Sequence, residues 1–112
     1  MSSTGDFDVE LVPVRDGVYV VRVIGDLDMA TAPTVEERIA SVVPASRLVI
    51  DLTKCTFLDS AAVRLLTTIA RDSGTAGTHL ALVASDPGIL RVLEITAVDD
   101  ILPVHSTLDE AL

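Results

Sequence analysis

Aromatic side chains, cysteine and basic residues are all scarce in this sequence. Aromatic residues make up 3% of its 112 residues, so aliphatic side chains must form the core that a chain of this length can bury. Eight Lys and Arg residues against 17 Asp and Glu give a formal net charge of -9, which disfavours contact with nucleic acid or anionic lipid. We therefore expect one globular domain over residues 1–112 that binds no nucleic acid.

Cysteine usage and hydropathy bear on the cellular compartment. Cys55 is the only cysteine, which rules out an internal disulfide and a paired-cysteine metal site and suits a reducing compartment. No apolar run approaches the ~18 residues of a membrane span, and residues 1–10 lack the basic and apolar segments of a signal peptide. These absences favour a cytoplasmic protein with no direct membrane insertion, in which Cys55 is a small, partly buried side chain.

The apolar pattern predicts the strands. Strands at residues 7–11 and 18–24 flank a turn at Asp16 and Gly17, which is typical of a β-hairpin. The continuous apolar runs at residues 47–52 and 79–84 are typical of buried central strands, and Pro103 limits residues 101–104 to an edge strand. Only the first strand should run antiparallel to its neighbour.

Helical spacing and capping residues predict the helices. Pro44 should end the first helix and Gly74 the second, and Asp109 would complete a capping box in a short last helix. The elements define an α/β fold class: a small mixed, mostly parallel sheet with an N-terminal antiparallel hairpin and about four helices. The expected N-caps or first residues of the helices are Thr31, Ser60, Asp86 and Ser106.

Two segments that follow predicted strands carry a cluster of polar side chains. The segments are GDLDMAT (25–31) and TKCTFLDS (53–60), and loops after parallel strands emerge at the same edge of a sheet. We expect them to form the candidate site, with Phe57 and Leu58 pointing in opposite directions. The polar members of this site are Asp26, Asp28, Thr31, Thr56, Asp59 and Ser60.

Hydrolytic chemistry fits these residues poorly. A Ser/His/Asp triad at Ser60 needs a nearby histidine, but His79 and His105 lie outside both segments and are expected at the surface. The run LVID (48–51) hints at nucleotide hydrolysis, but no GxxxxGK[ST] loop accompanies it. We expect no enzymatic activity and no cofactor.

Acidic sites of two other kinds are weakly supported. Asp26, Asp28 and Asp59 could ligate a hard cation, although this spacing is too common to be specific. A phosphoacceptor of the response-regulator type would be Asp51, but the segment ILPVHS (101–106) lacks the lysine that such a fold places near its last strand. Ser60 leaves two interpretations open: an N-cap, which the residue pattern alone favours, or an exposed hydroxyl that is itself modified.

The segment DLTKCTFLDSAAVRLL (51–66) resembles the signature of the sulfate transporter and anti-sigma factor antagonist (STAS) domain, especially its single-domain anti-sigma factor antagonists. In that signature an apolar strand ends in Asp-Leu or Asp-Phe and leads to an aromatic residue, an apolar residue, Asp and Ser before a helix. GDLDMATA (25–32) is similar to the family's Gly-acidic-Leu-Asp loop, and the order of elements agrees over nearly the whole chain. The resemblance implies a STAS-like fold.

The resemblance also implies a phosphorylation switch at Ser60. In that family the dephosphorylated protein binds an anti-sigma factor that is also a serine kinase, which frees a sigma factor. The kinase then phosphorylates the serine, and a metal-dependent serine phosphatase restores the binding form. An alternative is an accessory or scaffold subunit of a transport or stress-signalling complex. The residues expected to contact the partner are Asp26, Asp28, Thr31, Thr56, Asp59, Ala61, Ala62 and Arg64.

The chain departs from the family pattern in two places. Ala62 stands where a glycine is usual, so its methyl group is expected to crowd a partner, although alanine suits a helix better by roughly 1 kcal/mol. Thr96 and Ala97 stand where a glycine often precedes the last strand. Asp59 either stabilises the first helical turn or orients Ser60 or the partner. Arg64 is either a plain exposed arginine or a bridge to Asp59 or to a phosphate.

Overall fold

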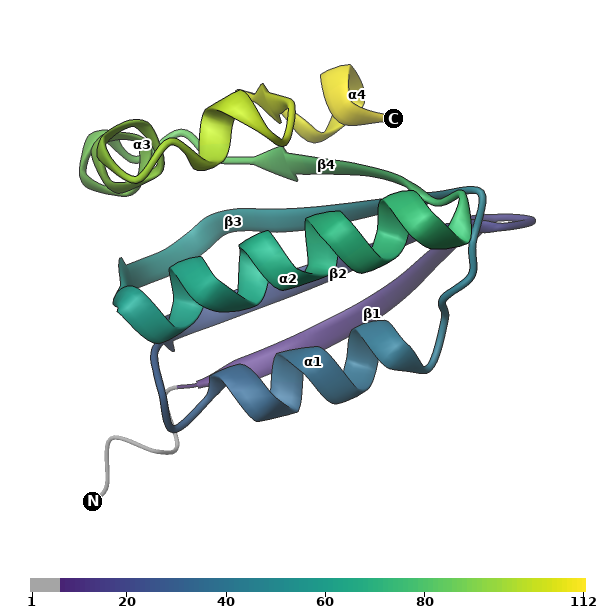
Figure 1. Ribbon diagram of the computed structural model, residues 1–112, viewed down its shortest axis with the longest axis horizontal. Helices are drawn as coiled ribbons and strands as arrows, with labels where there is room; N and C mark the ends of the chain where they lie inside the picture. The colour runs from purple at the N-terminus through teal and green to yellow at the C-terminus, as the bar shows by residue number, and fades with distance from the viewer. Residues whose placement is uncertain (1–6) are drawn as a thin grey trace.

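Strands and helices alternate after an initial hairpin in the computed structural model, which describes residues 7–112 (Figure 1). The strands are β1 (Asp8–Arg15), β2 (Val18–Leu27), β3 (Arg47–Leu58), β4 (His79–Val83) and β5 (Val104–His105). The helices are α1 (Ala32–Ala40), α2 (Ser60–Ala76), α3 (Pro87–Ile95) and α4 (Leu108–Ala111), with the 3-10 helix η2 (Val98–Asp100) before β5.

The strands form one mixed sheet in the order β1-β2-β3-β4-β5. β1 is antiparallel to β2 and the other neighbours pair in parallel, as predicted. Pro13 lies in the edge strand β1, where the register shifts between Pro13 and Arg15. A proline has no N–H to give to a further strand, so it discourages pairing at this edge. The predicted fold class is confirmed.

Both faces of the sheet carry buried apolar side chains, because successive strand residues point to opposite faces. On one face α1, α2 and α3 share a core with β1 to β4, and α1 and α2 lie in front of the sheet in Figure 1. On the other face α4 covers a smaller cluster made by Val20, Val49, Ala81, Val83 and Ala111. Within residues 7–112 no helix has the length and apolar character needed to cross a bilayer.

β2 and β3 extend further than predicted, so the expected loops at residues 25–31 and 53–60 are partly strand. Parallel pairing continues through two register shifts until Leu27 lies opposite Leu58. Both leucines are buried, and burial of this pair stabilises the extension. Gly25 has φ +96° beside the second shift, a backbone conformation that a glycine adopts without strain.

Other element boundaries also differ from the predictions. α2 runs past Gly74 and ends at Gly77, which has φ +81° and forms a left-handed cap. The last strand begins after Pro103, whose carbonyl accepts from the Leu82 N–H. The N-cap of α4 is Thr107 in place of Ser106, because the Thr107 hydroxyl accepts from the N–H of the residue three positions on.

Candidate functional site

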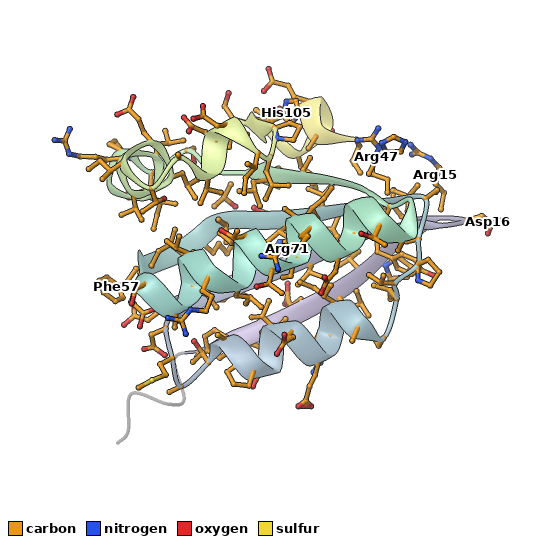
Figure 2. The ribbon with its side chains drawn as sticks, viewed as in Figure 1. Arg15, Asp16, Arg47, Phe57, Arg71 and His105 are labelled. Carbon is orange, nitrogen blue, oxygen red and sulfur yellow. The ribbon has the colours of Figure 1, made fainter. Side chains whose placement is uncertain are left out.

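The carboxyl ends of β2 and β3 bring the two predicted segments together. Asp26 lies opposite Phe57 in the parallel register, and the Asp59 N–H donates to the Leu27 carbonyl at 3.3 Å. Phe57 is half-exposed at the end of the sheet where α2 begins, whereas Leu58 is buried (Figure 2). The prediction that these two side chains point in opposite directions is confirmed.

Ser60 is the first residue of α2, and its side chain is exposed. The N-cap is Asp59, whose Oδ1 accepts from the Ala62 N–H at 2.9 Å. The expectation that Ser60 is the N-cap is therefore wrong, because the preceding carboxylate already takes that role. Within residues 7–112 we find no hydrogen bond to the Ser60 hydroxyl, the Ser60 N–H or the Ala61 N–H.

Asp59 also holds a second element. Its Oδ2 accepts from the Met29 N–H at 3.1 Å, which links the start of α2 to the loop between β2 and α1. A carboxylate at a helix N-terminus stabilises the helix through the cap bond and the helix dipole. Of the roles foreseen for Asp59, stabilisation of the first turn is confirmed, and the bond to the loop is new.

Thr31 and Asp28 close the β2–α1 loop on itself. Thr31 immediately precedes α1, as predicted, but its side chain makes no cap bond to the helix. Its hydroxyl donates to the Asp26 carbonyl at 2.8 Å and accepts from the Asp28 N–H at 2.9 Å. Asp28 Oδ1 accepts from the N–H groups of Ala30 and Thr31. The Thr31 side chain therefore fastens the loop in place of capping α1.

Asp26 and Thr56 join the two strands at the same edge. The Thr56 hydroxyl donates to Asp26 Oδ1 at 2.6 Å. In the described part of the chain Asp26, Asp28 and Asp59 are not gathered into a group that could ligate a metal ion. Each of their carboxylates accepts instead from a nearby hydroxyl or backbone N–H.

A groove of about 200 Å³ lies between the N-terminal parts of α1 and α2, and Ala61, the residue after Ser60, lines it. Met29 stands at its rim with 77% of its surface exposed. The two ion pairs found within residues 7–112 both belong to Arg22, so Arg64, which is exposed, forms no bridge to Asp59. The residues that line the groove are Met29, Ala32, Pro33, Glu36, Ala61, Arg64, Leu65 and Thr68.

Ala62 does not lie on the surface of the site. It is fully buried, and its methyl group belongs to the core beneath α2. Its N–H is occupied by Asp59. The expectation that this methyl group crowds a docking partner is therefore wrong, because a partner at the surface does not contact it.

The other polar candidates lie away from this edge. His79 begins β4, and His105 lies on β5, two strands away from β3. Asp51 is buried inside β3, where Arg22 and Thr53 donate to its carboxylate. A buried and fully bonded carboxylate of this kind is a structural group, not an exposed phosphoacceptor. Cys55 is buried, and that burial raises the pKa of its thiol.

The fold and this edge define a small α/β domain that presents one serine at the start of a helix. The family model described as STAS domain matches residues 11–111. The chain belongs to the STAS domain family, and the resemblance seen in residues 51–66 is confirmed.

Similar proteins share a regulatory name. The anti-sigma-F factor antagonist RsfB of Mycobacterium tuberculosis is 31% identical over 100 residues, which cover 88% of this chain and 81% of RsfB. A crystal structure of an anti-sigma factor antagonist from Mycobacterium paratuberculosis is 34% identical with a TM-score of 0.86, covering 99% of this chain and 95% of that one. Unphosphorylated SpoIIAA, at 20% identity and a TM-score of 0.76 over 93% of this chain and 92% of its own, shares the fold. The two likenesses above 30% identity support the general role of an anti-sigma factor antagonist.

Proposed function

We propose that the dephosphorylated chain binds an anti-sigma factor that is also a serine kinase, and so frees a sigma factor. Phosphorylation of Ser60 by that kinase ends the binding, and a serine phosphatase restores it. The observation that carries this proposal is the exposed Ser60 hydroxyl, which has no hydrogen-bond partner in the described part of the chain. A kinase can approach such a hydroxyl without first unfolding the helix.

The start of α2 can accept a phosphate without loss of the fold. Phosphorylation adds about -1.5 to -2 charges at a helix N-terminus, where free N–H groups and the dipole favour an anion. The N–H groups of Ser60 and Ala61 have no acceptor within residues 7–112. We therefore expect the phosphorylated chain to keep its secondary structure.

The same charge is unfavourable for a partner that meets this edge. Asp59 caps α2, and Asp26 and Asp28 add negative charge at the end of β2 and in the loop that Asp59 contacts. An added unit charge ~5 Å from an acidic group of a partner costs roughly 1 to 3 kcal/mol at an effective dielectric constant between about 20 and 80. That cost corresponds to a loss of affinity of up to about a hundredfold. A large conformational change is not needed for such a switch.

Phosphate transfer tests the proposal. The chain is incubated with ATP and each anti-sigma factor kinase of its own cell, and the product is analysed by mass spectrometry. We expect one phosphate on Ser60, which is lost in Ser60→Ala and kept in Ser85→Ala. Ser85 is a matched control because it is also exposed and lies just before a helix N-cap, Asp86. A phosphate on another residue, or none with any such kinase, would contradict the proposal.

Binding measurements separate the proposal from the alternative role in a transport or scaffold complex. Calorimetry should show that the unphosphorylated chain binds the kinase and that the Ser60-phosphorylated chain binds it tens of fold more weakly. Affinity purification of the chain from its native cell should then recover a soluble kinase. Recovery of a transporter or scaffold subunit in its place would favour the alternative.

A further inference from the structure

The geometry points to Asp59 as the residue that carries the effect of a phosphate on Ser60 to the β2–α1 loop. This inference rests on the proposed function only in taking Ser60 as the modified residue. It adds a second consequence of modification: the loop at Met29 is released, so the rim of the groove between α1 and α2 changes together with the charge at Ser60. Asp59 is in this sense a positioning residue.

Both oxygens of the Asp59 carboxylate accept a hydrogen bond in the unphosphorylated chain. One oxygen accepts from the Ala62 N–H at 2.9 Å, and the other accepts from the Met29 N–H at 3.1 Å. The Met29 bond is the one polar bond that we find between residues 28–31 and the start of α2 in the described part of the chain. Any movement of this carboxylate therefore changes how the loop is held.

The β2–α1 loop should move as a unit, because hydrogen bonds join its residues to one another. Asp28 Oδ1 accepts from the N–H groups of Ala30 and Thr31, and the Ala32 N–H donates to the Asp28 carbonyl at 2.8 Å. A turn held in this way passes a displacement at Met29 to its neighbours. Met29 lines the groove and is 77% exposed, so its displacement alters the surface that a partner meets.

A phosphate on Ser60 competes with Asp59 for the same part of the helix. Both groups are anions on consecutive residues at the start of α2, and the phosphate carries the larger charge. It repels the carboxylate, and it can accept from first-turn N–H groups as a charge-assisted acceptor. Of the two bonds of Asp59, the one to Met29 is the more exposed. We therefore expect the Met29 bond to break first, while the bond to Ala62 persists within the helix.

Amide exchange at Met29 tests the inference directly. Phosphoserine is introduced at position 60 during synthesis of the full chain, so that no kinase is needed. Nuclear magnetic resonance then compares the amide signals and hydrogen exchange of Met29 and Ala62 in the two forms. We expect Met29 exchange to accelerate about tenfold or more on phosphorylation, because a repelled carboxylate no longer accepts from the Met29 N–H. A smaller change is expected at Ala62.

Two Asp→Ser variants separate the loop bond from the cap. Serine is as good an N-cap as aspartate but has one oxygen, so Asp59→Ser should keep the helix cap and lose the bond to Met29. We expect fast Met29 exchange in this variant before phosphorylation and no further change after it. Asp86→Ser is the matched control, because Asp86 caps α3 through the Ile89 N–H and makes no bond to the loop. In this control Met29 should respond to phosphorylation as in the wild type.

The outcomes distinguish this inference from the proposed function. Unchanged Met29 signals in the wild-type chain after phosphorylation would overturn it, whatever the variants do. Protected Met29 exchange in Asp59→Ser would do the same, because the bond would then not hold the loop. Failure of every kinase to modify Ser60 would instead count against the proposed function and would leave the synthetic comparison intact.

Discussion

The Thr56 hydroxyl donates a 2.6 Å hydrogen bond to the Asp26 carboxylate, and this bond ties the end of β3 to the end of β2 where Ser60 is presented. Both residues are exposed, so water competes for the bond and its net contribution is modest. The bond matters because of its position. It lies beside the second register shift between the two strands, after which their pairing continues to the ends of both strands.

Thr56→Val should therefore lower the free energy of unfolding by roughly 0.5 to 1 kcal/mol. A double-mutant cycle with Asp26→Ala, measured by urea unfolding, should show a coupling energy of similar size. Thr34→Val is the control, since Thr34 is exposed on α1 and we find no hydrogen bond from its hydroxyl within residues 7–112. Additive effects of the two substitutions would show that the bond does not hold the strand ends.

Arg22 bonds two carboxylates that differ in burial, and the difference predicts unequal costs of removal. The hydrogen bond from Arg22 to Asp51 raises the pKa of the guanidinium most, and the hydrogen bond to Glu10 raises it further. The Asp51 side chain is 6% exposed and the Glu10 side chain 46%. Asp51→Ala should cost about 2 to 4 kcal/mol, because it leaves Arg22 and Thr53 without their buried acceptor.

Glu10→Ala provides the control for this pair on the same arginine. An exposed ion pair contributes about 0 to 1 kcal/mol, since water and salt screen it. Urea unfolding at low and moderate salt should show a small cost that shrinks as salt is added. Equal costs for the two carboxylates would mean that burial of Asp51 does not decide the strength of this group.

Ala97 adopts a left-handed backbone, with φ 62° and ψ 22°, just before η2. A side chain in this region costs roughly 1 to 2 kcal/mol, and this is the place where the family often has a glycine. Ala97→Gly should relieve that strain. It should also lower the free energy of unfolding by ~0.4 to 1 kcal/mol, because glycine gives the unfolded chain more conformational freedom. The net result should be a stabilisation of roughly 0.5 to 1 kcal/mol in thermal or urea unfolding. Ala70→Gly within α2 should have the opposite sign, and a destabilised Ala97→Gly variant would contradict the account.

Elements with local signals could be predicted from the sequence, and those set by distant contacts could not. Asp86 and Pro87 start α3 as predicted, because a capping side chain and a fixed φ act within one turn. The extent of β3 depends instead on pairing with β2, which continues until Leu58 meets Leu27. No feature of residues 53–58 alone distinguishes this irregular pairing from a loop.

The candidate site shows the same division. Asp59 and Ser60 are both good N-caps by type, and the backbone of Asp59 decides between them. The bond from Met29 to Asp59 spans 30 positions of the chain, and no local pattern announces it. Ala61 and Arg64 are the groove residues that the sequence analysis includes, and an apolar residue in the polar segment GDLDMAT was a signal for Met29. The groove residues that it misses are Met29, Ala32, Pro33, Glu36, Leu65 and Thr68. The aspartates and Ser60 were found because consecutive parallel strands bring their ends together.

The buried thiol of Cys55 gives a pH-dependent test of how well the end of β3 is shielded from solvent. It is 3% exposed, and its thiol donates to the Phe57 carbonyl at 3.3 Å. Burial raises the pKa of this thiol, so the unfolded chain ionises at lower pH than the folded chain. The buried, protonated thiol contributes fully to the free energy of unfolding below the unfolded pKa of about 8.5. This contribution is lost as the pH rises through the higher pKa of the folded chain. The free energy of unfolding should therefore fall more steeply above about pH 8.5 in the wild type than in Cys55→Ala, which has no thiol to titrate.

Alkylation of Cys55 by iodoacetamide should be slow in the native chain and should accelerate with urea. Native alkylation as fast as that of the unfolded chain would show that this end of β3 opens readily, and that Cys55 is not closed off beneath the site.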